Sequence, residues 1–279
     1  MGTDTAHKAD DAGVRLTPNG QDGDMGFDLE WDDKHVVPPV MFPDLSFLFR
    51  RMQEATVEQV NARQGERILD VGCGRAIDAV ELAKGDWECL GLEPSHTMIG
   101  HAKEYIAENS AAVLLIRGIG EGLPFKDGSF DTVMCKGALD HFPHPDMAIR
   151  EMARVLKPQG KAVIAIANFE SLSFRLGRKV FGVISLFSKE SRGSRRVWHV
   201  PEDHAYKFDY STLRSVIEPH LKLERAVGIS MFFGFPWWGL LLAKLPRRLS
   251  DFTLNSLDWL ARRMPSLSDT LVFRCTPRR

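Results

Sequence analysis

The stretch ILDVGCGRA, residues 68–76, combines an apolar run, an acid and two glycines at alternate positions. Asp70 ends the apolar run, and Gly72 and Gly74 follow it two and four residues later. Glycine permits a positive φ and lets a ligand lie against bare backbone. A carboxylate at this point would repel a pyrophosphate and would suit a ligand that carries positive charge. The spacing therefore predicts a cradle for a cationic small molecule.

The elements that must position this cradle alternate between short apolar runs and amphipathic stretches. Strands are expected at 67–72, 88–94, 112–118, 129–137, 161–168, 221–229 and 270–277. Helices are expected at 44–63, 76–84, 96–108, 145–156 and 210–219, with Asp44 capping the first and the turn 157–160 ending the fourth. Strands that alternate with helices at this spacing indicate βαβ units and a parallel sheet covered on both faces.

Composition divides the chain into a core and less regular segments. Residues 1–33 carry nine acids against two bases and few large apolar side chains, so we expect a disordered acidic arm. We expect residues 34–279 to form a single domain with its ligand-binding core at 64–168. A basic and apolar helical insertion is expected at 169–200, and a second insertion at 230–268.

Charge and cysteine usage exclude several classes of protein. The net charge of −1 argues against a general nucleic-acid binder. The four cysteines are far apart and show no zinc-ligand spacing, so no metal is expected. The N-terminus is unlike a signal peptide, and no apolar run reaches the ~18 residues needed to cross a bilayer, which together favour a cytoplasmic location.

Several motifs in order resemble the class I S-adenosylmethionine-dependent methyltransferases. The family pattern is an acid, any residue, then Gly-x-Gly-x-Gly, which Asp70, Gly72 and Gly74 match with Ala76 at the third glycine. Further matches are Glu93 in GLEPS, GEGLPFKDGSFDTV at 120–133, ALDHF at 138–142, and AIREMARVLKPQGKAVIA at 148–165. The resemblance, over about 68–167, implies a Rossmann-like, seven-stranded, mostly parallel α/β sheet with helices on both faces, plus helical insertions.

The resemblance implies S-adenosyl-L-methionine as cofactor and a set of residues around it. Asp70, the glycine turn and Lys136–Gly137 would hold the methionine end, and Glu93 would hold both ribose hydroxyls. The family commonly has an acid after the third strand, where Ile119 stands here, so a backbone carbonyl or Glu121 would take over the adenine contact. The expected cofactor-binding set is Asp70, Gly72, Cys73, Gly74, Glu93, Pro94, Ile119, Gly120, Glu121, Lys136 and Gly137.

Two of these side chains have plainer interpretations. Cys73 fits a small loop filler better than a nucleophile, because the neighbouring sequence suggests no paired base. For Lys136, the alternative to a role in cofactor binding is a side chain that merely points to solvent.

His141 is the first candidate for a catalytic base, because a histidine pKa lies near operating pH. Asp140 precedes it and would orient it or bind substrate; the alternative for His141 is a packed or pocket-lining role. His144 is expected at a surface turn, and His199 and His204 are further base candidates.

The favoured function is methyl transfer to a small-molecule or lipid-linked acceptor by in-line displacement, at an acceptor pocket that the insertions would cover. A nicotinamide oxidoreductase on a similar fold is the alternative, although Ile77 stands where the last glycine of Gly-x-Gly-x-x-Gly would be needed. A non-catalytic binding module is a third. The tryptophans and bases of 231–248 suggest either a lid or peripheral contact with the inner face of the membrane. The oligomeric state is left open.

Overall fold

The computed structural model describes residues 29–35, 41–187, 205–235 and 237–278. His199, His204 and most of the expected acidic arm lie outside these ranges. In the described part, no helix is both long enough and apolar enough to cross a membrane.

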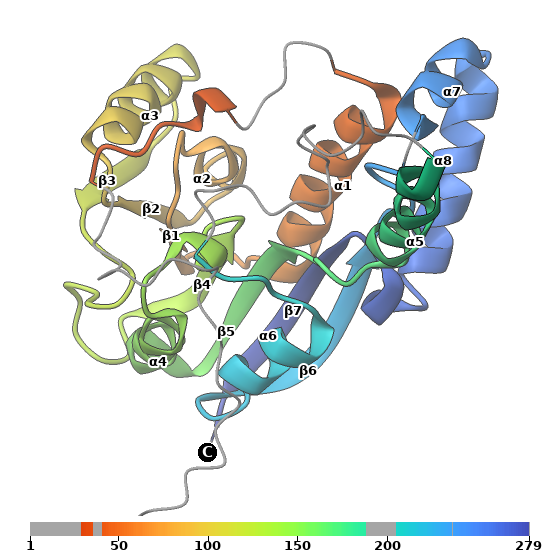
Figure 1. The fold of residues 1–279 in the computed structure, drawn as a ribbon. Coiled ribbons are helices and arrows are strands. Elements are labelled where there is room, and N and C mark those ends of the chain that lie inside the picture. Colours follow the sequence, from red (N-terminus) through yellow and green to blue (C-terminus); the bar gives the residue numbers. More distant parts are fainter. Residues whose placement is uncertain (1–28, 36–40, 188–204, 236, 279) are drawn as a thin grey trace, which may run out of the picture.

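A seven-stranded sheet with the order β3-β2-β1-β4-β5-β7-β6 forms the centre of the molecule (Figure 1). The strands are β1 (Arg67–Val71), β2 (Glu88–Glu93), β3 (Val113–Arg117), β4 (Phe130–Lys136), β5 (Leu156–Ala167), β6 (Leu221–Ile229) and β7 (Thr270–Pro277). Only β7 runs antiparallel to its neighbours, so the prediction of a Rossmann-like, mostly parallel sheet is confirmed.

Helices cover both faces of this sheet. They are α1 (Pro43–Val60), α2 (Ile77–Leu82), α3 (His96–Glu108), α4 (Pro145–Val155), α5 (Leu172–Phe187), α6 (Tyr210–Ile217), α7 (Trp238–Lys244) and α8 (Arg247–Ala261), with 3-10 turns η1 (Asp33–His35), η2 (Leu139–His141) and η4 (Pro265–Leu267). One core cluster joins the sheet to α4 and α6, and another joins it to α1 and α2.

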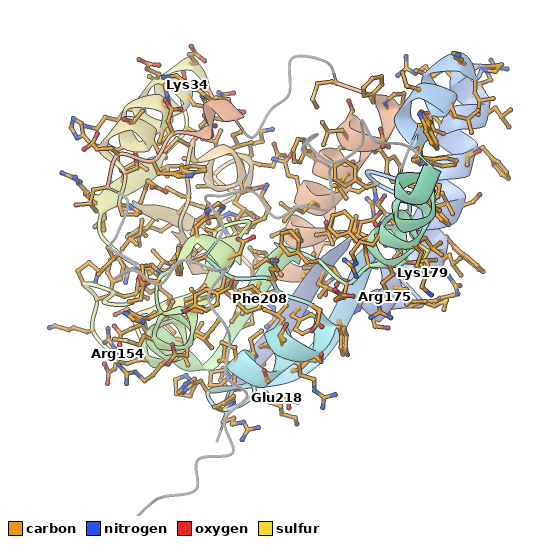
Figure 2. The ribbon with its side chains drawn as sticks, in the orientation of Figure 1. Lys34, Arg154, Arg175, Lys179, Phe208 and Glu218 are labelled. Carbon is orange, nitrogen blue, oxygen red and sulfur yellow. The ribbon has the colours of Figure 1, made fainter. Side chains whose placement is uncertain are left out.

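Alternation along the strands produces these two cores. In β4, Val133 and Cys135 pack toward α4 and α6, whereas Met134 packs toward α1. Successive side chains of a strand point to opposite faces of the sheet. All three are fully buried because helices cover both of these faces. Figure 2 shows Phe208 in the interior, while Arg154 and Glu218 lie at the periphery.

Two local expectations are wrong. Asp44 does not cap α1: Phe42 precedes the helix, and Asp44 lies buried in the first turn after Pro43. Proline suits the first helical position because its fixed φ is helical and its missing N–H would be unpaired there anyway. The turn expected at 157–160 is part of β5, which begins directly after α4 and pairs with β4 through a register shift.

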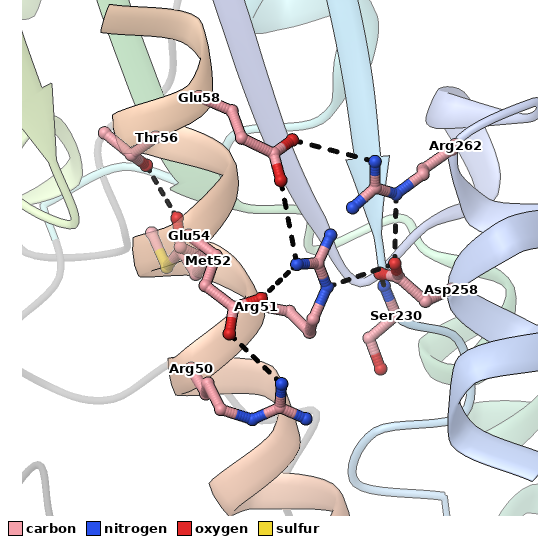
Figure 3. A network of polar contacts seen from close by, with 9 residues as sticks. All are labelled: Arg50, Arg51, Met52, Glu54, Thr56, Glu58, Ser230, Asp258 and Arg262. Atoms are coloured by element: carbon pink, nitrogen blue, oxygen red, sulfur yellow. Dashed lines mark hydrogen bonds and ion pairs between the residues drawn. The ribbon is translucent and has the colours of Figure 1, made fainter. Parts of the chain in front are cut away.

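A polar network joins the second insertion to α1 (Figure 3). Asp258 of α8 accepts from Arg51 Nε at 3.2 Å, from Arg262 Nε at 3.0 Å and from the Ser230 backbone N–H at 3.2 Å. Arg51 and Asp258 are buried, and Glu54 also pairs with Arg51. A buried ion pair of this kind requires its partners, because either charge alone would be desolvated without compensation.

Asp269 joins the two insertions to each other. Its carboxylate accepts from the Phe233 backbone N–H at 2.9 Å and from the hydroxyl of Ser173 in α5. Burial raises the pKa of Asp269 to about 6, although these hydrogen bonds favour its ionised form.

The packed body begins before residue 34. The backbone carbonyl of Trp31 accepts a hydrogen bond from Ser95 Oγ at 2.6 Å, and that of Leu29 accepts one from the His96 backbone N–H at 3.0 Å. The last part of the expected acidic arm, residues 29–33, therefore lies against the start of α3. Residues 1–28 lie outside the described part of the chain.

Candidate active site

The turn between β1 and α2 bends sharply because three of its residues are left-handed. Gly72, Gly74 and Ala76 have φ values of 72°, 52° and 59°. A Cβ at Gly72 would lie 2.5 Å from the Ala138 Cβ, so only glycine fits there. Ala76 adopts the same region at a modest energetic cost and directly precedes α2. The turn thus exposes backbone beside the end of β1.

Three buried acids surround this turn. Asp70, Asp78 and Glu93 are 3%, 7% and 5% exposed. Glu93 is the last residue of the neighbouring strand β2, and its two oxygens accept from the backbone N–H groups of Gly74 at 3.0 Å and Ser95 at 2.9 Å. The acid on β2 is therefore bonded directly to the glycine turn on β1.

One lysine lies among these acids. The Nζ of Lys136, at the end of β4, lies 2.6 Å from Asp78 Oδ2, and its side chain is 21% exposed. The interpretation that Lys136 merely points to solvent is therefore wrong. The other oxygen of Asp78 is buried and has no hydrogen-bond partner among the described residues.

Electrostatics make this cluster receptive to positive charge. Burial raises the pKa of Asp70 well above its ordinary value, Asp78 and Glu93 raise it further, and Lys136 opposes them. Burial also raises the pKa of Glu93, against the lowering effect of its backbone hydrogen bonds. Three desolvated acids with one cation nearby leave a local excess of negative charge, which a cationic ligand would relieve.

Asp78 was missed by sequence reasoning. It lies in the first turn of α2, where an acid is commonplace because it interacts favourably with the helix N-terminus. Its distance in sequence from Lys136 gave no sign of the ion pair. The order of the strands brings the two together, because β1 lies between β2 and β4.

The expected adenine-side residues lie next to an aromatic side chain that was also missed. A Cβ at Gly120 would lie 2.7 Å from a ring atom of Phe142, which also lies beside Gly72. Glu121 is buried, and Oε1 accepts from the His144 backbone N–H at 3.2 Å. Burial raises the pKa of Glu121. Ile119 is half-buried.

Pro94 and Gly137 complete the expected set at the ends of β2 and β4. Pro94 is half-buried, and its carbonyl accepts from Arg117 Nε at 3.1 Å. Gly137 is exposed, has a φ of 65° and donates its N–H to the Ala165 carbonyl at 2.8 Å. Both residues therefore lie beside the edge of the sheet that carries Glu93 and Lys136.

His141 and Asp140 lie in η2, directly after β4. His141 Nε2 is 4.0 Å from Asp140 Oδ1, which is longer than a hydrogen bond. The His141 ring lies 5.4 Å from the Trp31 ring, and its charge lowers the pKa of Glu93. The structure therefore places His141 beside Trp31 and within electrostatic reach of Glu93. The Asp140 carbonyl accepts from the N–H groups of Ala205 and Tyr206.

The segment 29–35 borders the site, which the sequence did not indicate. Arg75, within the glycine turn, forms an ion pair with Asp33, with Nη2 at 2.7 Å from Oδ1. Asp32, Asp33 and His101 have ligand atoms within 4.8 Å of one another. Cationic side chains already pair with both acids, since Lys34 lies 2.7 Å from Asp32.

Cys73 is not suited to nucleophilic chemistry. Burial raises the pKa of its thiol well above the ordinary value, and Asp70 and Glu93 raise it further. Because the thiolate is the reactive form, this thiol is inert. Its sulfur packs where Gly91 has no side chain: a Cβ there would lie 2.7 Å from Sγ.

Comparisons with known proteins agree with this geometry. Residues 69–164 match the family described as Methyltransferase domain. The chain is 33% identical over 109 residues to the uncharacterized methyltransferase YcgJ of Bacillus subtilis, covering 39% of this chain and 43% of that protein. The crystal structure of YcgJ has a TM-score of 0.55 at 20% identity and is similar over 82% of this chain and 99% of that one.

Two further relatives have named acceptors. A demethylmenaquinone methyltransferase of Corynebacterium efficiens is 34% identical over 42% of this chain and 48% of that protein. A ubiquinone biosynthesis O-methyltransferase of Dechloromonas aromatica is 30% identical over 42% of this chain and 51% of that protein. The matched segments thus span about half the length of these relatives. Residues 69–164 thus resemble a methyltransferase domain in sequence, and most of the chain shares the fold of YcgJ.

Proposed function

We propose that the chain transfers a methyl group from S-adenosylmethionine to a small-molecule or lipid-linked acceptor. The observation that carries this proposal is the group of buried acids, Asp70, Asp78 and Glu93, around the glycine turn. Such a group is unfavourable by itself, because each charge is desolvated and repels the others. A ligand with a cationic amino group and a sulfonium offsets that repulsion.

The residues present fit this cofactor. Gly72 lacks the side chain that would collide with Ala138, so the turn can pass close to the residues that follow β4. The buried, unpartnered oxygen of Asp78 can accept from an amino group. Asp70, Asp78 and Lys136–Gly137 would hold the methionine end, Glu93 the ribose, and Ile119, Gly120 and Glu121 the border of the adenine.

Asp70 is also the feature that disfavours the oxidoreductase alternative. A dinucleotide site presents backbone N–H groups and a helix N-terminus to a pyrophosphate. Here Asp70 and Asp78 flank that position, and both are buried. A pyrophosphate at α2 would meet two carboxylates rather than free donors.

When bound, the cofactor supplies an electrophilic methyl group attached to a positively charged sulfur. The protein's part is then alignment and exclusion of water, which together can contribute about 7–11 kcal/mol. Trp31 and Phe142 border the site and would limit the access of water. His141 would accept a proton at an imidazole nitrogen where the acceptor must be deprotonated, and its ring is held beside Trp31.

The acceptor class follows from the relatives and from the insertions. The named relatives act on demethylmenaquinone and in ubiquinone biosynthesis. Helices α5, α7 and α8 lie outside the matched region, and α7 and α8 pack beside α1 (Figure 1). Apolar side chains predominate in these helices, which suits a hydrophobic acceptor better than a protein.

The test is transfer of radiolabelled methyl from S-adenosylmethionine to metabolites and lipids of a bacterial extract, followed by identification of the labelled product. We expect label in a small or lipid-linked product. His141→Gln should slow transfer if His141 is the base, while Glu88→Gln, an exposed acid on β2, serves as the matched control. Label only in protein or nucleic acid, or in no product, would contradict the proposal.

A further inference from the structure

Helices α7 and α8 turn large apolar side chains to solvent. On α8, Phe252, Trp259 and Leu249 are 70%, 57% and 48% exposed. Trp237, Leu240 and Leu241, at and within α7, are 64%, 49% and 52% exposed. We call this the hairpin surface. It lies on the outermost helices of the molecule (Figure 1).

The core does not require these side chains. The inward side of α8 is already formed by Ser250, Leu254, Asp258 and Ala261, which are buried and recur at helical spacing. Leu249, Phe252 and Trp259 repeat with the same period on the other side. An amphipathic helix that is apolar on its solvent side as well needs a further partner.

The charges on these helices favour an anionic partner. Lys244, Arg247, Arg248 and Arg263 are exposed. Asp251 is the exposed acid between residues 238 and 263, because Asp258 is buried against Arg51. The Arg263 guanidinium lies 3.5 Å from the centroid of the Trp259 ring, which joins a cation to the apolar side chains. A second copy of the chain is disfavoured as the partner, because a two-fold contact would bring the same bases together and they would repel one another.

A recess adjoins the hairpin surface on the side of α1. This groove of about 450 Å³ is lined by Arg50, Arg247 and Asp251, by Ser46 and Ser250, and by apolar residues such as Phe47 and Leu254. The Ser250 hydroxyl is buried and has no hydrogen-bond partner among the described residues. Two cations against one acid, a buried hydroxyl and an apolar wall suit the headgroup and upper acyl chain of an anionic phospholipid.

We propose that the hairpin surface binds the face of an anionic phospholipid bilayer. The helices lie in the interface, with the tryptophans and Phe252 at the boundary between headgroups and acyl chains and with the bases against phosphates. The Arg51–Asp258 pair holds α8 to α1, so that the protein docks as a unit. This interaction goes beyond methyl transfer and needs neither cofactor nor acceptor.

The test is flotation of the full chain with vesicles, without S-adenosylmethionine or acceptor. We expect binding to vesicles that contain phosphatidylglycerol and little binding to pure phosphatidylcholine. Phe252→Ser should weaken binding about tenfold or more, and Arg248→Glu about fivefold or more. Salt should weaken the binding, because it screens surface charge.

Matched controls separate the surface from nonspecific effects. Leu114→Ser removes an exposed apolar side chain from β3, and Lys103→Glu reverses an exposed charge on α3. Both should bind like the unmodified chain, and thermal melting checks that every variant is folded. Absence of vesicle binding, equal binding to both lipids, or equal losses in the control variants would overturn the proposal. So would a dimer that Phe252→Ser disrupts, measured by sedimentation, without vesicle binding.

Discussion

Charged residues are placed in opposite ways at two ends of the molecule. The cofactor end is the proposed site around the glycine turn, and the insertion end is formed by α7 and α8. Around the glycine turn, Asp70, Asp78 and Glu93 are buried, and Lys136 pairs with Asp78. On α7 and α8 the bases are exposed, and apolar side chains lie among them. The acid cluster keeps unfavourable charge buried at the ends of the parallel strands β1 and β2 and at the start of α2. The insertion end keeps apolar area outside on helices packed against α1.

This difference indicates two separable functions. A buried acidic cluster is suited to a small cationic ligand, and an exposed apolar and basic surface to an extended anionic one. The Arg51–Asp258 pair fixes α8 to α1, and the hydrogen bonds of Asp269 join the two insertions, so neither contact includes an acid of the cluster around the glycine turn. Changes at one end should therefore leave the other nearly unaffected.

The largest effect should come from Arg51→Ala, which leaves Asp258 buried without that partner. We expect the free energy of unfolding to fall by about 3–5 kcal/mol, as measured by urea denaturation. Arg50→Ala is the matched control: its exposed pair with Glu54 should contribute only about 0–1 kcal/mol. Equal losses for the neighbouring arginines would contradict a special role for the α1–α8 contact.

The pH dependence of stability should follow Asp269. Its pKa of about 6 in the folded chain lies above the ordinary 3.8, so protonation favours folding. Stability should therefore fall as pH rises from about 4 to about 6, by up to roughly 3 kcal/mol for this group. Asp269→Asn keeps an acceptor for Phe233 and should flatten this part of the profile. Identical profiles from pH-dependent melting would contradict this, and cofactor affinity at neutral pH should not change.

At the cofactor end, Glu93→Ala should weaken binding of S-adenosylhomocysteine by about 1.5–3 kcal/mol, the usual effect of losing a hydrogen bond to a charged group. Glu88→Ala, on the same strand but exposed, should bind normally. Calorimetry measures both. Vesicle binding of the Glu93 variant should equal that of the unmodified chain; a parallel loss would indicate general unfolding.

The smallest effect is expected at the rim of the site. Arg75→Ala breaks the partly exposed ion pair with Asp33 and should weaken cofactor binding by about 0–1 kcal/mol. A loss as large as that of Glu93→Ala would mean that residues 29–35 contribute directly to the cofactor site. Calorimetric titration with S-adenosylhomocysteine measures the loss for each variant and so distinguishes a rim contact from a direct contribution to the site.

The sequence predicted the sheet and the glycine turn because their signals are local. Short apolar runs mark each strand, and Asp70, Gly72 and Gly74 lie within five consecutive residues. β6 and β7 were expected with the bounds that the structure gives. The antiparallel direction of β7 agrees with the expectation of a mostly parallel sheet.

The missed features depend on contacts between distant residues. Asp78 approaches Lys136 only through the strand order, and Trp31 approaches His141 only because residues 29–33 fold back onto α3. Asp44 seemed a cap because a cap residue and a first-turn acid have the same sequence signal. Tertiary packing decides where such a helix begins, and the spacing of apolar residues in the sequence does not show that packing.

The central claim is that the buried acids select a ligand with the cationic amino group that S-adenosylmethionine and S-adenosylhomocysteine share, and exclude a pyrophosphate. Calorimetric titration of the unmodified chain with S-adenosylmethionine, S-adenosylhomocysteine and NADH, in parallel, tests it most directly. The account predicts binding of both sulfur compounds at micromolar concentrations and no binding of NADH. Binding of NADH, or no binding of either sulfur compound, would contradict it.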